Sequence, residues 1–131
     1  MKEITVVAAA LCKDDKIFIA QRPENKLPPL VWEFPGGKPE KGESLQQALK
    51  RELKEELGVE TRIGDFIAKN VHNYDFAKVT INLFKAQLQN EDDVICDNEH
   101  VATAWVRCSE LDNYEFAKAD VPLISWVKKM I

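Results

Sequence analysis

The chain has 131 residues, of which 45% are hydrophobic and 31% are charged, and its formal net charge is −4. This size and composition are typical of one globular domain, predicted over residues 1–131, and leave no room for a second. The negative charge argues against binding to nucleic-acid polymer, which needs a basic surface, and no segment has the apolar length of a membrane span, so neither partner is expected.

The N-terminal third predicts a hairpin followed by a loop. Residues 4–12 are β-branched and small, Asp14-Asp15 marks a turn, and residues 16–21 resume strand character. Residues 22–31 contain three prolines and are predicted to form a loop. A short extended stretch, residues 32–34, then leads into a Pro-Gly-Gly sequence.

A central helix is predicted from residue 45 to residue 57. Ser44 can cap its start, and Gly58 stands where a left-handed residue commonly ends a helix. Its apolar residues recur at four-residue spacing on one face: Leu45, Leu49, Leu53 and Leu57.

The remaining chain predicts further strands and a last helix. Residues 59–70 suggest extended chain with a turn near Gly64-Asp65. The elements expected after it are a strand at 78–88, an acidic loop at 89–99, a strand at 101–107, an irregular segment at 112–119 and a helix at 121–131 with apolar residues at Val121, Ile124, Val127 and Met130. Strands on both sides of a central helix, with another helix at the end, predict an α+β or layered α/β fold.

The central helix carries an unusual set of carboxylates. At about 100° per residue, Glu52, Glu55 and Glu56 lie on one arc beside the leucine stripe. Such like charges repel, and a hard cation with several oxygen ligands would remove the penalty. The alternative is a solvated helix face on which Lys50 and Lys54 form weak surface pairs with the glutamates.

Residues 37–59 read GKPEKGESLQQALKRELKEELGV. This sequence resembles the box of the Nudix family, G-x5-E-x7-R-E-U-x-E-E-x-G-U with U aliphatic, and matches every defined position. The resemblance implies a Nudix fold, in which a mixed β-sheet lies between helices as an α/β/α sandwich. It also implies hydrolysis of a nucleoside diphosphate linked to another group, with Mg²⁺ or Mn²⁺ as cofactor.

The same resemblance assigns roles to the box residues. Glu52 and Glu56 are expected to be the main metal ligands, with Glu55 a third and the backbone carbonyl of Gly36 a fourth. Arg51 is expected to orient a neighbouring glutamate. Glu43 is expected to contact a metal ligand or a metal-bound water, and it could also favour the positive end of the helix.

Beyond the box, Glu99 lies six residues before Trp105. In MutT-type members of the family, a glutamate at that offset supplies a metal ligand or the base, so Glu99 is the candidate for activating water. The alternative is that Glu99 is one of several loop acids, with Glu91, Asp92, Asp93 and Asp97. His72 and His100 are interpreted as loop or strand residues rather than catalytic ones.

Three residues are candidates for substrate binding. Arg22 could pair with a phosphate or be a surface arginine. Phe34 could stack on the base or belong to the core. The family position of Asp120 contacts the base, where its carboxylate could accept from an exocyclic amine such as that of cytosine; it could also cap the last helix.

The run from Trp32 to Lys38 and the ending from Tyr114 to Leu123 also resemble the MutT-like group, including its CTP pyrophosphohydrolases. The predicted function is Mg²⁺-dependent hydrolysis of nucleoside triphosphates to monophosphate and pyrophosphate, on CTP-type or oxidised nucleotides, for cleaning the nucleotide pool. The alternatives are a hydrolase of another linked diphosphate, such as a dinucleoside polyphosphate, and a nucleotide sensor with little turnover. The chain is expected to be a monomer or homodimer.

The cysteines bear on the compartment. Cys12, Cys96 and Cys108 are an odd number without CxxC spacing, which favours neither a disulfide framework nor a zinc site. The first three residues lack the flanks of a signal peptide. Both observations predict the cytoplasm.

Overall fold

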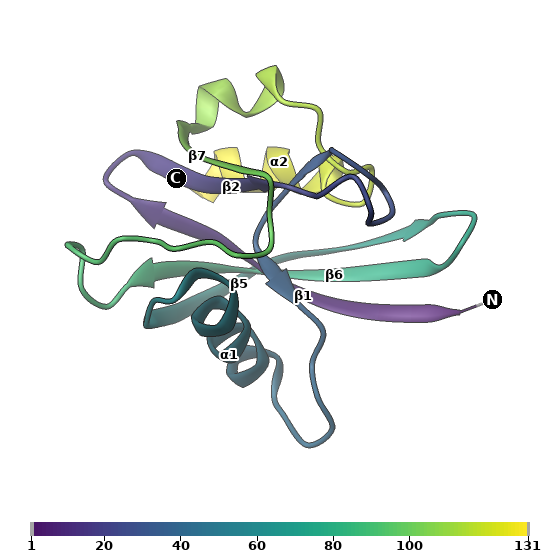
Figure 1. The fold of residues 1–131 in the computed structure, drawn as a ribbon, viewed down its shortest axis with the longest axis horizontal. Coiled ribbons are helices and arrows are strands. Elements are labelled where there is room, and N and C mark those ends of the chain that lie inside the picture. The colour runs from purple at the N-terminus through teal and green to yellow at the C-terminus, as the bar shows by residue number, and fades with distance from the viewer. Residues whose placement is uncertain (1, 131) are drawn as a thin grey trace.

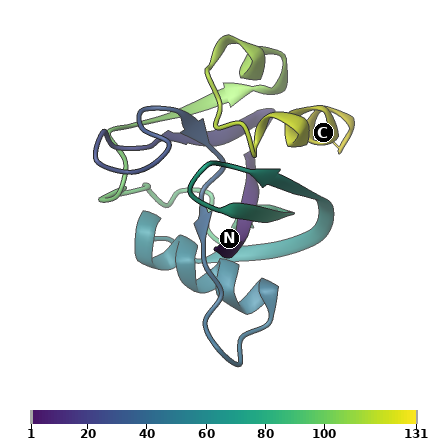
Figure 2. The same ribbon diagram turned by 90° about the vertical axis from the view of Figure 1, so that its right-hand side faces the viewer.

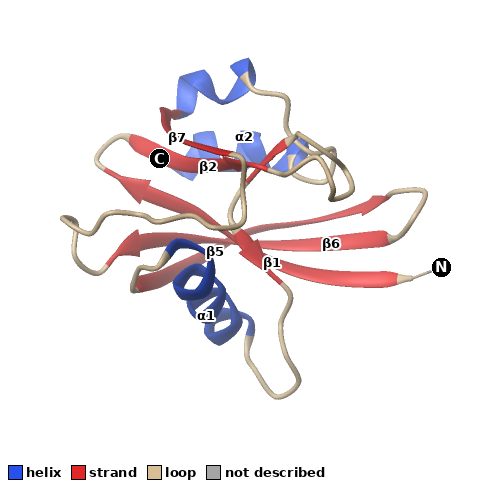
Figure 3. Ribbon diagram, viewed as in Figure 1, coloured by secondary structure: helices blue, strands red, loops and turns tan. Residues whose placement is uncertain are grey.

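The computed structural model describes residues 2–130, which form one mixed sheet and its covering helices (Figure 1, Figure 3). The strands and helices are β1 (Glu3–Lys13), β2 (Lys16–Gln21), β3 (Trp32–Glu33), β4 (Gly36–Gly37), α1 (Leu45–Leu57), β5 (Thr61–Asn73), β6 (Lys78–Leu88), β7 (Ala102–Arg107), the 3-10 helix η1 (Cys108–Asn113) and α2 (Val121–Met130).

The sheet is built around β1. Its main strand order is β3-β2-β1-β6-β5, with β4 also paired to β1 and β7 to β2. The β1–β6 pair is parallel and the other pairs are antiparallel. The hairpin predicted at the N-terminus is confirmed, since Cys12 pairs with Ile17 on either side of a turn in which Asp14 is left-handed.

Helices α1 and α2 cover opposite faces of this sheet (Figure 1, Figure 2). Alternate residues of β1 therefore enter two separate cores. Val7, Ala9 and Leu11 pack on the α1 side, whereas Ala8, Ala10 and Cys12 belong to the core on the α2 side. The predicted α/β/α arrangement is confirmed.

Local sequence signals determine the ends of α1. The Ser44 hydroxyl accepts a hydrogen bond from Gln47 N at 3.1 Å, and the Gln47 side chain accepts one from Ser44 N at 2.9 Å, which completes a capping box. Gly58 ends the helix at a φ of 70°. The leucine face is buried against the sheet, with Leu49, Leu53 and Leu57 inaccessible to solvent.

One sequence prediction was wrong in detail. The turn expected at Gly64-Asp65 is a register shift inside the continuous strand β5, because an extra residue bulges out of the ladder. In α2, the buried side chains are Leu123, Ile124 and Val127. Residues nine apart point to opposite sides of a helix at about 100° per residue, so Val121 and Met130 could not share that face and are exposed.

Two further properties concern the chain as a whole. Cys12, Cys96 and Cys108 are free thiols. Within residues 2–130, no helix has the length and apolar character needed to cross a membrane.

Candidate active site

A cavity of about 410 Å³ opens beside β3 and β4, where the loop of residues 22–31 and the segment before α2 meet. One part of its lining is apolar and aromatic and includes the buried acid Asp120. Another part carries the charged groups Glu33, Glu56, Glu99 and His100. The cavity can therefore take an elongated molecule with one planar, apolar end and one charged end.

The two glycines of β4 allow close packing at this site. A Cβ on Gly36 would lie 1.9 Å from the backbone oxygen of Val7, and a Cβ on Gly37 would lie 2.3 Å from Glu52 Oε2. Contacts shorter than 3.0 Å force something to move. Glycine at these positions therefore lets β4 lie against β1 and lets the Glu52 carboxylate reach the strand.

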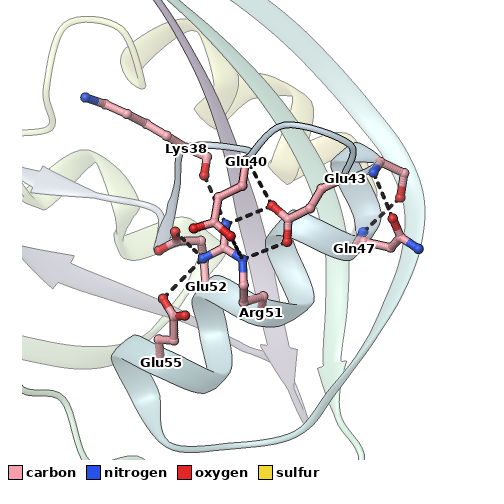
Figure 4. Close-up of polar contacts among 8 residues, drawn as sticks. Lys38, Glu40, Glu43, Gln47, Arg51, Glu52 and Glu55 are labelled. Carbon is pink, nitrogen blue, oxygen red and sulfur yellow. Dashed lines mark hydrogen bonds and ion pairs between the residues drawn. The ribbon is translucent and has the colours of Figure 1, made fainter.

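Arg51 connects α1 to the loop that precedes it (Figure 4). Its guanidinium donates to both oxygens of Glu43, at 2.7 and 2.9 Å, and to the carbonyl of Lys38 at 3.1 Å. It also donates to Glu52 Oε1 at 2.9 Å and Glu55 Oε2 at 3.2 Å. Arg51 thus holds three glutamates at once.

The position of Glu43 is explained by this contact. Hydrogen bonds from the Arg51 side chain and from the backbone N–H of Glu40 lower the pKa of Glu43 to about 2. Glu43 therefore stays ionised and holds Arg51 from the side opposite to Glu52. Its predicted contact with a metal-bound water stays a prediction.

Glu56 occupies a different environment from its neighbours. Its Oε2 is buried and has no hydrogen-bond partner. The pKa of Glu56 is raised to about 8, chiefly by burial and further by the negative charges of Glu52, Glu33 and Glu99, against the opposing effect of His100. A buried acceptor without a donor is costly, so this carboxyl is not explained by the stability of the fold.

These residues fit a divalent cation. A cation beside Glu56 would satisfy its orphaned oxygen and offset the repulsion among the surrounding carboxylates, and hard ions prefer such oxygen ligands. Within residues 2–130, no three acidic, histidine or cysteine side chains already converge as metal ligands. Arg51 instead pairs with Glu52 and Glu55.

Glu99 lies at the rim of the same cavity. Its side chain is half-exposed, and Lys26 Nζ lies 3.6 Å from its Oε2. Its backbone N–H donates to Asp97 Oδ1 at 2.8 Å. The Glu99 carboxylate therefore lines the same cavity as Glu56 and is open to solvent.

His100 is a site residue that sequence reasoning missed. Its side chain is only 4% exposed, and its ring nitrogens lie 2.8 Å from Asp97 Oδ2 and 2.9 Å from Glu33 Oε2. Burial alone would lower the pKa of His100, but these hydrogen bonds and charges outweigh it and raise the pKa above 6.5. The spacing Asp97-x-x-His100, typical of a turn closed by a side chain, was the available signal.

Arg22 extends the same network. It donates to Glu33 Oε1 at 2.9 Å and to the carbonyls of Pro28 and Leu27 at 3.0 and 2.8 Å. Three of its five N–H groups are thus used to hold the 22–31 loop, and two are left for a ligand. Arg22 lines the cavity.

Asp120 and Phe34 lie together at the apolar part of the cavity. Asp120 is 4% exposed, and its Oδ2 accepts a hydrogen bond from Phe34 N at 3.1 Å. Burial and the charge of Glu33 raise the pKa of Asp120 well above its ordinary value, although the Phe34 N–H and Arg22 act against this. The carboxyl bonds to the Phe34 backbone rather than to the first turn of α2, and the Phe34 ring packs on Phe116 at 5.3 Å between centroids.

The predicted site residues therefore gather in two adjoining groups. Those that line the cavity are Arg22, Phe34, Gly36, Glu56, Glu99 and Asp120. Those joined by hydrogen bonds on α1 and its preceding loop are Glu43, Arg51, Glu52 and Glu55. The Gly37–Glu52 contact connects the two groups.

Comparison with known proteins identifies the fold and the box. The NUDIX domain model matches residues 1–127. The CTP pyrophosphohydrolase of Escherichia coli (strain K12) is 40% identical over 124 residues, which cover 95% of this chain and 90% of that protein. The 8-oxo-dGTP diphosphatase of Proteus vulgaris is 37% identical over 84 residues, which cover 63% of this chain and 75% of that one.

A solved structure gives the same result. The solution structure of the E. coli ORF135 protein superposes with a TM-score of 0.83 at 36% identity, covering 99% of this chain and 91% of that chain. The resemblance in the box is therefore confirmed over nearly the whole sequence. The chain belongs to the Nudix family of hydrolases.

Proposed function

We propose that this protein is a Mg²⁺-dependent pyrophosphohydrolase that converts nucleoside triphosphates, with a preference for cytosine nucleotides, to monophosphate and pyrophosphate. The observation that carries the proposal is one cavity that contains both the buried acid Asp120 and the carboxylates Glu56 and Glu99. The 40% identity to a protein named CTP pyrophosphohydrolase supports the choice of base.

Asp120 is the residue proposed to distinguish the base. Its ionised form accepts from the exocyclic amine of cytosine, and its protonated form donates to an unprotonated ring nitrogen. Uracil offers neither partner in the same arrangement, because it has a carbonyl and a ring N–H instead. Phe34 fixes the Asp120 carboxyl through its backbone N–H and supplies an apolar wall.

Glu56, Glu52 and Glu55, with the carbonyl of Gly36, are the groups proposed to hold the metal. When bound, the divalent ion neutralises the charge of the diphosphate and lowers the pKa of bound water. The orphaned oxygen of Glu56 and the Glu52 carboxylate against Gly37 supply two of these ligands. Arg51 holds Glu52 and Glu55 in position before the ion binds.

The hydrolytic step uses one water molecule. Its oxygen attacks one of the two phosphorus atoms of the α–β anhydride, the anhydride bond breaks, and the phosphate group on the other side departs with the bond electrons, which yields monophosphate and pyrophosphate. We assign the proton from the water to Glu99, which is exposed at the cavity rim. Arg22 has two free N–H groups with which to bind a phosphate oxygen.

The test is pyrophosphate and phosphate release with Mg²⁺ across a nucleotide panel. The panel contains CTP, dCTP, 5-methyl-dCTP, UTP, dGTP, 8-oxo-dGTP and a diadenosine polyphosphate, with Glu56→Gln as the inactive control. Pyrophosphate release that is fastest with cytosine nucleotides and absent in Glu56→Gln is the expected result. Hydrolysis of the diadenosine polyphosphate alone would overturn the assignment to triphosphates. No hydrolysis of any substrate would favour a nucleotide sensor with little turnover.

A further inference from the structure

The short segment that carries Asp120 is held by side chains of a distant strand. Ala119 is 2% exposed and lies directly before Asp120. Its N–H donates to the Tyr74 hydroxyl at 2.9 Å, and its carbonyl accepts from the Asn70 amide at 2.9 Å. Both backbone groups of one residue are therefore bound by side chains from β5 and its C-terminal end.

Tyr74 is itself firmly placed. Its ring stacks on Phe76 at 5.0 Å between centroids with 12° between the planes, and the His72 ring packs against it edge-on at 4.6 Å. Tyr74 lies one residue beyond β5, in the turn to β6, where its backbone N–H donates to the carbonyl of Ala77 at 2.8 Å. Residues 117–119 form no helix or strand of their own, but Ala117 is bonded through its N–H to the Trp32 carbonyl and through its carbonyl to Asp120 N. The contacts from Asn70 and Tyr74 add to these and hold Ala119 itself.

The Asp120 carboxyl accepts a hydrogen bond from Phe34 N at 3.1 Å. The Asp120 backbone is bonded to Ala117 and to Leu123 at the start of α2, and the residue before it is held by Asn70 and Tyr74. An N–H···O hydrogen bond has its best distance at about 2.7–3.2 Å and weakens steeply when its angle falls below about 120°. A small movement of Ala119 would therefore change how Asp120 meets a base edge while the metal-binding part of the cavity stays as it is.

We propose that Tyr74 and Asn70 are positioning residues that set base selectivity by fixing Ala119 and, through it, the Asp120 carboxyl. The inference rests on the proposed function, in which Asp120 contacts the base. Neither side chain needs to touch the substrate through its polar group, because the Tyr74 hydroxyl and the Asn70 amide are already used on Ala119.

The experiment measures the ratio of kcat/KM for CTP to that for UTP. Tyr74→Phe removes only the hydroxyl, and Asn70→Ala removes the second contact from the half-buried face of β5. Tyr114→Phe is the matched control, since that ring packs on Trp32 and its hydroxyl makes no hydrogen bond with the described residues. Asp120→Asn serves as the reference for complete loss of the carboxyl.

We expect Tyr74→Phe and Asn70→Ala each to lower the CTP-to-UTP ratio by about tenfold, the effect of losing one well-aligned hydrogen bond, while kcat for CTP and the Mg²⁺ requirement change little. Tyr114→Phe should leave the ratio within about twofold of the wild type. In an Asp120→Asn background, Tyr74→Phe should have no further effect on the ratio, because the group that it positions is gone.

The outcomes separate the two claims. If Asp120→Asn leaves the ratio unchanged, the proposed base recognition is wrong. If Asp120→Asn abolishes the preference but neither Tyr74→Phe nor Asn70→Ala alters it, the positioning role is overturned and the proposed function stands. A general structural defect in Tyr74→Phe would lower turnover of both nucleotides equally, so it would leave the ratio unchanged and count against the inference.

Discussion

Replacing Glu56 by glutamine is expected to stabilise the metal-free protein at neutral and alkaline pH. The pKa of Glu56 in the folded protein is about 8, against an ordinary value of 4.5. The folded state therefore binds this proton more tightly than the unfolded chain does. For a carboxyl whose pKa is raised on folding, stability is highest below pH 4.5 and falls as the pH rises toward 8.

The magnitude follows from the two pKa values. Each tenfold difference in proton affinity corresponds to about 1.4 kcal/mol, so ionisation of Glu56 costs the folded state roughly 4 kcal/mol by pH 7.5. Glutamine carries no charge at any pH and escapes this cost. It retains a polar group at the orphaned position, so the informative quantity is the pH dependence of the difference between the proteins.

The assay is urea unfolding of both proteins in the presence of a chelator, at a series of pH values from 4.5 to 8.5. We expect the free energy of unfolding of Glu56→Gln, relative to the wild type, to rise by several kcal/mol across that range. Both proteins share every other titrating group, so the difference reports the titration of Glu56 together with its coupling to His100 and the neighbouring carboxylates. A difference that changes by less than about 1 kcal/mol would refute the argument that this carboxyl is destabilised by burial and by its neighbours.

Adding Mg²⁺ tests the other half of the same argument. A ligand that binds only the folded state stabilises it by about 1.4 kcal/mol at ten times its Kd. The wild type should gain this stability at pH 8, whereas Glu56→Gln should gain much less. Equal gains in the two proteins would mean that the ion binds elsewhere.

Three further predictions concern the surroundings of this carboxyl. Gly36→Ala should lower the free energy of unfolding by more than about 2 kcal/mol, because the new Cβ meets the backbone of β1. Gly37→Ala displaces only the flexible carboxylate of Glu52, so this variant should fold normally but lose Mg²⁺ affinity and activity. Thermal melts and Mg²⁺ titrations distinguish the two variants, and equal stability would contradict the packing argument. Glu43→Gln should be less stable than the wild type above pH 4.5, and the difference in stability should shrink as the pH falls toward 2. The pKa of Glu43 is lowered, so the wild type loses the stabilising contact with Arg51 only when Glu43 is protonated near pH 2. Acid unfolding curves of the two proteins that stay parallel would argue against this contact. His100→Gln should keep only one of the hydrogen bonds to Asp97 and Glu33. It should lower kcat about tenfold or more with little change in KM for the nucleotide. An unchanged kcat would show that Glu99, the neighbouring acid, does not need support from His100.

The features that the sequence predicted are those with local causes. The helix of residues 45–57 has its cap, its leucine face and its terminating glycine within a few residues of one another. The carboxylate cluster on that helix follows from helical periodicity alone. The box pattern then supplies the glycines and Glu43, so most of the metal-binding part of the site could be proposed before the structure was known.

The features that the sequence could not predict are contacts between distant segments. Tyr74 and Ala119 are 45 residues apart, and His100 and Glu33 are 67 residues apart. Each pair forms because the fold brings distant segments together. The turn after β5 meets the segment before α2, and the loop before β7 meets β3, and no local pattern encodes either contact. The buried face of α2 is a related case, since only the packed sheet decides which side of a short helix is buried.

The two parts of the cavity combine into one argument about selectivity and rate. The carboxylates of α1 repel one another, and Glu56 has a buried oxygen without a donor, so this part of the fold is suited to holding a cation at the expense of stability. The Asp120 part is the opposite case, because the backbone of Ala119 and the carboxyl of Asp120 each have fixed hydrogen-bond partners. Glu33 lies between them, bonded to both Arg22 and His100, and its charge acts on both Glu56 and Asp120. Changes at Glu33 should therefore alter base preference and Mg²⁺ affinity together, whereas changes at Tyr74 should alter base preference alone.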